Sequence, residues 1–334
     1  MTTRLLTYII LCFCLINELN SQDIHFSQFN LAPLNLNPAM TGSFNGDYRI
    51  AGNHRNQWSS VTTPYRTFGL SMEKNKVVND AVSAGLQINQ DRAGDSRFST
   101  FQINLSGSYL FKFKDTSNFL SLGSQIGFTN RNLDYNPLSF DAQYNGYQYD
   151  PTLPNQEYFL RNSRNYANLN FGIGHFFIKE KLNIQSGIAI FNLTAAKQSF
   201  YNDNNIRLDP RLVIHSKGVY SISNKINLLP GLLWMKQGKH QQMILNLETE
   251  YILVNFMRTY RSLWAGLSYR NKDALFLTTG MNYDNWKIGI SYDINISKLV
   301  PASMLRGGFE IAIIYIIDKT PIEMIIHRIC PDYI

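Results

Sequence analysis

The chain has 334 residues and a formal net charge of +7, from 31 lysines and arginines against 24 aspartates and glutamates. A basic balance can indicate nucleic-acid binding, but no run of lysines and arginines occurs, so we attribute the charge to solvated rims and a polar interior. After residue 21, no apolar run reaches the roughly 18 residues that indicate a transmembrane helix.

The first 21 residues have the pattern of a secretory signal peptide. Arg4 supplies a positive start, and an apolar run follows from Leu5 to Ile16. That run is too short to span a bilayer, which needs roughly 20 apolar residues. Small Ser21 suits the last position before cleavage, which predicts a mature chain starting at Gln22 or Asp23.

Cysteine usage gives two further predictions. Cys12 and Cys14 lie in the signal, and each follows a bulky residue rather than the small one that a lipid-anchoring signal requires. Only Cys330 remains in the mature chain, so no internal disulfide framework can form. The lone thiol, followed by Pro331, predicts either a pairing with another molecule or a reactive site, and the alternative is a buried small hydrophobic residue.

Residues 22–46 precede the first predicted strand. They contain Asn37-Pro38-Ala39 among several leucines. We expect this N-terminal segment either to dock at the periplasmic face or to plug the lumen of a barrel. The alternative is an extended lead-in that is ordered by its proline.

The remaining chain alternates apolar and polar residues with the period of two that is typical of β-strands. Between Ser99 and Phe113, apolar side chains such as Leu105 occupy one face and polar ones such as Asn104 the other. Aromatic residues near strand ends suit the headgroup level of a membrane. The predicted strands are 47–55, 65–74, 80–90, 98–113, 118–131, 166–178, 182–193, 210–221, 226–236, 241–251, 262–270, 274–283, 286–293 and 308–317.

About fourteen such strands predict a transmembrane antiparallel β-barrel over residues 47–317. Connections after even-numbered strands are mostly tight, whereas those after odd-numbered strands include the long 132–165, 194–209 and 294–307. Outer-membrane barrels alternate short periplasmic turns with longer external loops. An even count therefore leaves residues 318–334 as a periplasmic tail. The competing fold is a soluble β-sandwich or solenoid, which gives no reason for this alternation.

Asp91-Arg92-Ala93-Gly94-Asp95 lies at the tip of a predicted outer hairpin. Two carboxylates around a glycine turn could hold a hard cation. The alternative is ordinary turn chemistry, with Asp91 or Asp95 paired to Arg92.

Catalytic and cofactor motifs are missing from the sequence. The six histidines lack metal-ligand spacing, and no G-x-S-x-G, H-E-x-x-H or Walker motif occurs. We expect no enzyme activity, cofactor or metal, although a barrel hydrolase can assemble Ser, His and an acid from distant strands.

Short motifs are spread along the whole mature chain. In order they are Phe26-Ser27-Gln28, Asn37-Pro38-Ala39, Arg55-Asn56-Gln57-Trp58, Pro64-Tyr65, Asp91 to Asp95, Phe191-Asn192-Leu193-Thr194, Ser199-Phe200, Ser291-Tyr292-Asp293, Lys298-Leu299, Gly308-Phe309-Glu310 and Cys330-Pro331. This series resembles the PorP/SprF membrane proteins of the Bacteroidota type IX secretion and gliding system, although Phe191-Asn192 departs from the family's usual start of that motif.

The resemblance implies an outer-membrane barrel that supports export or surface attachment of large adhesins. The implied partners are outer-membrane lipid, periplasmic and outer-membrane secretion components, and the adhesin, with no nucleic acid. It supplies no established catalytic or binding residue. The candidates for structural or partner contacts are Asn37, Pro38, Asp91, Arg92, Gly94, Asp95, Cys330 and Pro331.

A barrel of about 14 strands is narrower than the 16 to 18 strands that leave an open aqueous channel. We therefore expect a partner-binding component rather than the protein-conducting pore. The alternative function is a channel for small or hydrophobic molecules, because barrels also enclose ligand cavities and channels.

Overall fold

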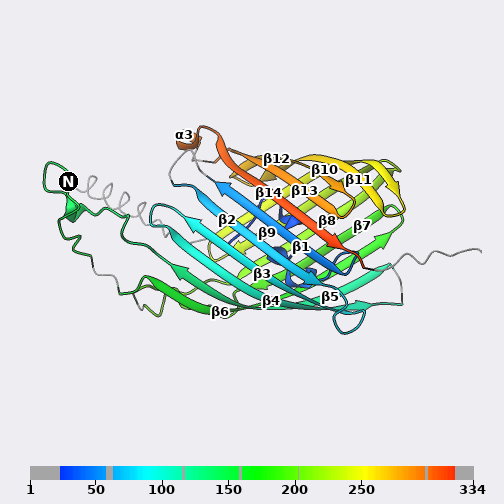
Figure 1. Cartoon of the computed structure of the whole chain (residues 1–334), viewed down its shortest axis with the longest axis horizontal. Coiled ribbons are helices and arrows are strands. Elements are labelled where there is room, and N and C mark those ends of the chain that lie inside the picture. Colours follow the sequence, from blue (N-terminus) through cyan, green and yellow to red (C-terminus); the bar gives the residue numbers. More distant parts are fainter. Residues whose placement is uncertain are drawn as a thin grey trace, which may run out of the picture.

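The computed structural model describes residues 23–57, 63–114, 117–157, 160–201, 203–297 and 300–319. Fourteen antiparallel strands form one closed barrel, in which each strand pairs with its neighbours in sequence and β14 pairs with β1 (Figure 1). The strands are β1 (Tyr48–Gln57), β2 (Tyr65–Lys74), β3 (Val82–Ala93), β4 (Phe98–Lys112), β5 (Asn118–Asn132), β6 (Ser163–Lys179), β7 (Leu182–Phe191), β8 (Arg211–Ser223), β9 (Ile226–Gln237), β10 (His240–Phe256), β11 (Thr259–Arg270), β12 (Ala274–Tyr283), β13 (Trp286–Asn295) and β14 (Arg306–Ile317). The predicted fold class and strand number are confirmed.

The two ends of the barrel differ in their connections. One end, here called the short-turn end, holds the start of β1, the end of β14 and the connections 75–81, 113–117, 180–181, 224–225, 257–258 and 284–285. The other, the long-loop end, holds the connections 58–64, 94–97, 133–162, 192–210, 238–239, 271–273 and 296–305. The predicted alternation is confirmed, although β9 and β10 are joined at the long-loop end by only 238–239.

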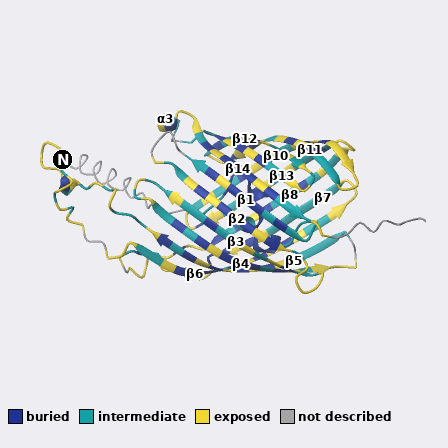
Figure 2. Ribbon diagram, in the orientation of Figure 1, coloured by how far each residue is buried: buried dark blue, intermediate teal, exposed yellow. Residues whose placement is uncertain are grey.

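Side chains alternate between the outside of the barrel and its lumen, as the period of two predicts (Figure 2). Leu105 is 65% exposed, whereas Asn104 on the same strand is 5% exposed and faces the lumen. Trp286 stacks on Tyr315 near the short-turn end, at 4.3 Å between ring centroids. Tyr292 pairs with Phe309 near the long-loop end. The outer surface therefore has an apolar belt with aromatic residues toward both rims, which suits a lipid bilayer.

Within the described residues, five short helices accompany the strands. Three follow one another in the N-terminal segment, namely η1 (Phe29–Leu31), α2 (Pro33–Leu36) and η2 (Pro38–Met40), and two lie at the long-loop end, namely η3 (Asp141–Gln143) and α3 (Val300–Ser303). Pro33 and Pro38 each occupy a first helical position, where the fixed φ of proline is suitable and its missing N–H costs no hydrogen bond. No helix in the described ranges has the length and apolar character needed to cross a membrane.

Two predicted parts of the chain lie outside the described residues. The predicted signal peptide 1–21 is one of them. Of the predicted tail 318–334, only Asp318 and Lys319 are described, so Cys330 and Pro331 also lie outside.

Candidate functional site

The N-terminal segment lies inside the barrel. The backbone N–H of Asp23 donates to Oε1 of Gln237, at the long-loop end of β9. At the other end of the segment, the N–H of Asp47 donates to the carbonyl of Ile317, at the short-turn end of β14. The chain therefore passes along the lumen from one end to the other (Figure 1, blue). We refer to residues 23–44 as the plug.

A buried glutamate on β14 holds the plug backbone. Oε2 of Glu310 accepts the N–H of Ser27 at 2.7 Å, and its Oε1 accepts the N–H of Gln28 at 2.9 Å. The Gln28 side chain returns a hydrogen bond to the carbonyl of Glu310 at 3.3 Å. Hydrogen bonds to a charged acceptor are stronger than neutral ones, so this is a firm attachment point.

Two arginines and an aspartate form a charged group next to Ser27 of the plug. Nη2 of Arg55 lies 3.2 Å, and Nη1 of Arg270 3.1 Å, from Oδ2 of Asp293. The hydroxyl of Ser27 donates to Asp293 and accepts from Arg270. We refer to Arg55, Arg270, Asp293 and Glu310 as the ion cluster; all four are buried. Buried charges are tolerated only when they are paired and hydrogen-bonded, and the plug supplies several of those bonds.

Asp23 fixes the plug at the long-loop end. Its carboxylate lies 3.7 Å from Nη1 of Arg211 and accepts a hydrogen bond from Nδ2 of Asn192 at 3.1 Å. Burial alone would raise the pKa of Asp23, but Arg211 and Asn192 outweigh it and hold the pKa below its ordinary value. Arg211 also donates to the carbonyl of Ile24 at 2.9 Å. The end of the plug is therefore held by a charge pair as well as by backbone contacts.

Asn37 sits on glycines of the barrel wall. Its Nδ2 donates to the carbonyl of Ile173 at 3.0 Å, and its Oδ1 accepts the N–H of Ala39 at 2.8 Å. A Cβ at Gly172 or Gly187 would overlap the Asn37 side chain, and one at Gly123 would overlap the backbone at Ala39. These glycines allow the backbone of η2 to lie directly against β5, β6 and β7.

Another buried ion pair, Arg49 with Glu73, holds the plug where it leaves the lumen. Arg49 donates from Nε and Nη2 to the two carboxylate oxygens of Glu73, at 2.8 and 2.7 Å. Arg49 also donates to the carbonyl of Met40 at 3.1 Å, and Glu73 accepts the N–H of Gly42 at 3.0 Å. The pair therefore binds the plug through both of its members.

Apolar packing accompanies these polar contacts. Phe29 packs in one buried cluster with Phe191, Val213, Leu233 and others of the wall. Leu31 packs in a second, with Ala51, Trp264, Ala312 and Ile314. The plug thus buries hydrophobic side chains inside a lumen that is otherwise polar.

The wall formed by β3 to β6 is lined by amides that bind one another. Gln87 accepts hydrogen bonds from Asn104 at 3.1 Å and from Gln125 at 3.2 Å, and Gln125 accepts one from Asn170 at 2.7 Å. We refer to Gln87, Asn104, Gln125 and Asn170 as the amide cluster. Its four members are buried, and these hydrogen bonds do not involve the plug.

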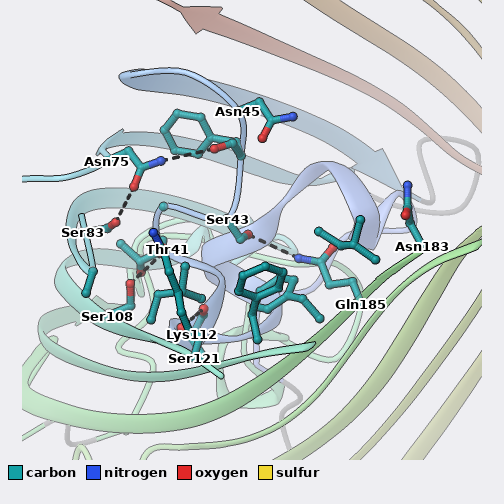
Figure 3. Close-up of a pocket in the computed structure, with 18 of the residues that line it drawn as sticks. Thr41, Ser43, Asn45, Asn75, Ser83, Ser108, Lys112, Ser121, Asn183 and Gln185 are labelled. Atoms are coloured by element: carbon teal, nitrogen blue, oxygen red, sulfur yellow. Dashed lines mark hydrogen bonds between the residues drawn. The ribbon is translucent and has the colours of Figure 1, made fainter. Parts of the chain in front are cut away.

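A cavity of about 430 Å³ lies at the short-turn end, next to the last residues of the plug (Figure 3). The plug residues Thr41 and Ser43 form part of its wall, and Ser43 accepts a hydrogen bond from Gln185 of β7 at 3.3 Å. Lys112 and Lys217 also line the cavity. It is the kind of mixed, partly polar recess that could receive a peptide or a small molecule.

The Asp91 to Asp95 turn lies at the long-loop end, where Asp91 is the register partner of Thr67, which is itself the register partner of Arg55. Asp91 accepts a hydrogen bond from Thr67 at 2.6 Å, and Gly94 has a φ of +67°. Among the described residues, no ion pair joins Arg92 to Asp91 or Asp95, so the predicted pairing is not formed. The described ranges also contain no group of three His, Cys, Asp or Glu residues placed to hold a metal ion.

The members of the ion cluster were not predicted as site residues. Three of them nevertheless lie in sequence motifs, since Arg55 begins one and Asp293 and Glu310 each end one, whereas Arg270 lies in none. The plug residues Ser27 and Gln28 lie in the first motif. The ion-cluster residues could have been predicted as site residues because each is a charged residue at a lumen-facing strand position, where a charged side chain needs a partner. Asn37 and Pro38 were among the predicted structural or partner-contact residues, but the sequence did not indicate which wall residues Asn37 contacts.

Comparison with protein families identifies the chain. A family model described as type IX secretion system membrane protein PorP/SprF matches residues 18–315. The chain belongs to this family. Together with the closed barrel and its apolar belt, membership makes the protein an outer-membrane component of the type IX secretion system. No curated protein matched the chain in a further comparison.

Solved structures with a similar fold are outer-membrane barrels. A Pseudomonas aeruginosa FadL homologue is 13% identical with a TM-score of 0.50, over 84% of this chain and 92% of the other. The TodX deltaS2S3 mutant, a monoaromatic hydrocarbon channel, is 11% identical with a TM-score of 0.51, over 85% and 93%. At such identities the likeness concerns the fold of this PorP/SprF family member and not its activity.

Proposed function

We propose that this PorP/SprF family member supports export or surface attachment of large adhesin-like proteins by binding partners, and does not itself conduct the secreted protein. The observation that carries this proposal is the plug. It occupies the lumen and is held by buried contacts with Glu310, Asp293, Arg211, Ile173 and Glu73, which belong to five different strands.

The space left beside the plug supports the same proposal. The cavity at the short-turn end is about 430 Å³, and two crevices beside the plug nearer the long-loop end are about 20 Å³ each. A folded adhesin domain is far larger than either. A 14-strand barrel is also narrower than the 16- to 18-strand barrels that leave an open channel.

We propose an orientation with the short-turn end in the periplasm, because outer-membrane barrels keep their short turns there. The cavity next to Thr41 and Ser43 would then face periplasmic secretion components, and the loop 133–162 would face the adhesin outside. On this view the protein works as an adaptor and not as a catalyst.

A channel for small or hydrophobic molecules is the second candidate function. The cavity at the short-turn end favours it, since it could form the inner part of a path beside the plug. Planar-bilayer recordings on the purified protein separate the two candidates: steady conductance would favour the channel, and its absence the adaptor.

A disulfide between plug and wall tests the adaptor proposal directly. A Cβ built at Gly174 lies 3.5 Å from Cβ of Ala39, within the range that a disulfide spans, and only the flexible end of Met40 must move. We expect Ala39→Cys/Gly174→Cys, in a Cys330→Ser background, to lock the plug while adhesin display at the cell surface continues.

The single variant Ala39→Cys in the same background is the matched control. Display that stops when the disulfide forms, and returns on reduction, would mean that the plug must leave the lumen. That result would contradict the adaptor proposal and support a conducting role.

A further inference from the structure

Two arginines face each other on the outer surface of the barrel. Arg66 on β2 and Arg92 on β3 are direct cross-strand partners, and both are exposed. Each lies next in sequence to an inward-facing residue, Thr67 or Asp91, so both arginines point away from the lumen. The two strands lie side by side in Figure 1.

The arginines lie where the apolar belt ends. On the same face of β2, Arg66 is followed by Phe68, Leu70 and Met72, all of which are exposed. Arg66 is near the first residue of β2 and Arg92 near the last of β3, so both lie close to the long-loop end. A cation at this depth reaches the headgroup region, while the residues beyond it contact acyl chains.

This arrangement is electrostatically unfavourable for the protein alone. Like charges directly opposite each other on neighbouring strands repel and destabilise the pair. No ion pair with a described residue involves Arg66 or Arg92. The residues 58–62, which precede β2, include no acidic side chain. An anion from outside the chain would remove the repulsion.

Further polar groups complete a recess at this place. A cavity of about 460 Å³ is lined by both arginines and by Arg97, Ser99, Asn132 and Asp134. Arg97 and Asp134 form an exposed ion pair at 3.8 Å. The recess therefore carries three guanidinium groups against one carboxylate, together with the hydroxyls of Thr63 and Ser99 and the amide of Asn132.

We propose that this recess binds the phosphate group of a glycolipid in the outer leaflet of the outer membrane. Arg66 and Arg92 hold the phosphate between them, because the planar guanidinium fork matches phosphate oxygens in a bidentate way. The acyl chains lie along Phe68 and Leu70 of the belt. The assignment to the outer leaflet rests on the proposed orientation of the barrel.

Purified full-length protein in detergent tests this proposal by its affinity for lipid A and by the rise in Tm that lipid A causes, since a ligand of the folded state stabilises it. We expect binding of lipid A to weaken roughly tenfold in Arg66→Gln/Arg92→Gln. Dephosphorylated lipid A should bind the native protein as weakly as lipid A binds the variant. Without lipid, the variant should melt no lower than the native protein, because the repulsion is gone.

Lys236→Gln is the matched control, since Lys236 is an exposed cation near the long-loop end of β9 on another part of the wall. It should bind lipid A as the native protein does. Equal binding of lipid A with and without its phosphate, or an equal loss in Lys236→Gln, would overturn the site. A full rise in Tm with inorganic phosphate alone would overturn the lipid assignment, as would an equal rise with phosphatidylglycerol.

Discussion

The ion cluster and the amide cluster line the same lumen, but they satisfy their buried polar groups in different ways. The four amides of the amide cluster bind one another, so these hydrogen bonds form without the plug. The charges of β1, β11, β13 and β14 share their hydrogen bonds with His25, Ser27 and Gln28 of the plug. The amide cluster is therefore satisfied within the wall, whereas the ion cluster depends on the N-terminal segment.

Removing a member of the ion cluster should have the largest effect. Glu310→Ala takes the acceptor from two plug N–H groups and leaves Arg55 short of a counter-charge, which we expect to cost about 3–5 kcal/mol. The free energy of unfolding in detergent measures the loss, and limited proteolysis reports whether the plug is released. A loss of stability no greater than that of an amide-cluster variant would remove the distinction between the ion cluster and the amide cluster.

A smaller effect is expected where the plug backbone touches the wall. A Cβ at Gly172 overlaps Oδ1 of Asn37, so Gly172→Ala should destabilise the plugged barrel by about 1–3 kcal/mol. Gly107→Ala serves as the control, because its Cβ would meet nothing closer than 3.9 Å. Thermal unfolding of the two variants side by side checks the prediction. Equal melting temperatures would mean that the plug adjusts freely at Asn37.

The smallest effect is expected in the amide cluster. Gln125→Ala removes one hydrogen bond to Gln87 and one to Asn170, with a net cost of about 1 kcal/mol. Proteolysis of the plug should be unchanged, since neither bond involves it. Faster cleavage of the plug in this variant would show that the amide wall also supports it.

The sequence was sufficient to predict the strands and their two faces, because a period of two is a local property that residues such as Leu105 and Asn104 display directly. It did not distinguish a plug from a periplasmic docking segment, since Leu31, Leu34 and Asn37 suit either environment. The association of the ion-cluster residues could not be predicted from the sequence, for a different reason. Arg55 and Glu310 are far apart in the chain, and only closure of the barrel brings them together.

The role of the wall glycines could not be predicted for the same reason. Gly123, Gly172 and Gly187 weaken a strand when it is judged alone, yet here they make room for η2. Their role can be recognised only when the neighbour that approaches them is known. The sequence pattern predicted the strands of the barrel wall, whereas the path of the plug inside it could be seen only in the structure.

Arg55 and Glu310 are also register partners across the junction of the first and last strands. The plug binds Glu310 through Ser27 and Gln28, and Arg55 through the carbonyl of His25, so its complete binding site at this junction exists only when β1 is paired with β14. We therefore expect the N-terminal segment to reach its full set of partners only in a closed barrel, so that its docking marks a barrel whose circle of strands is complete.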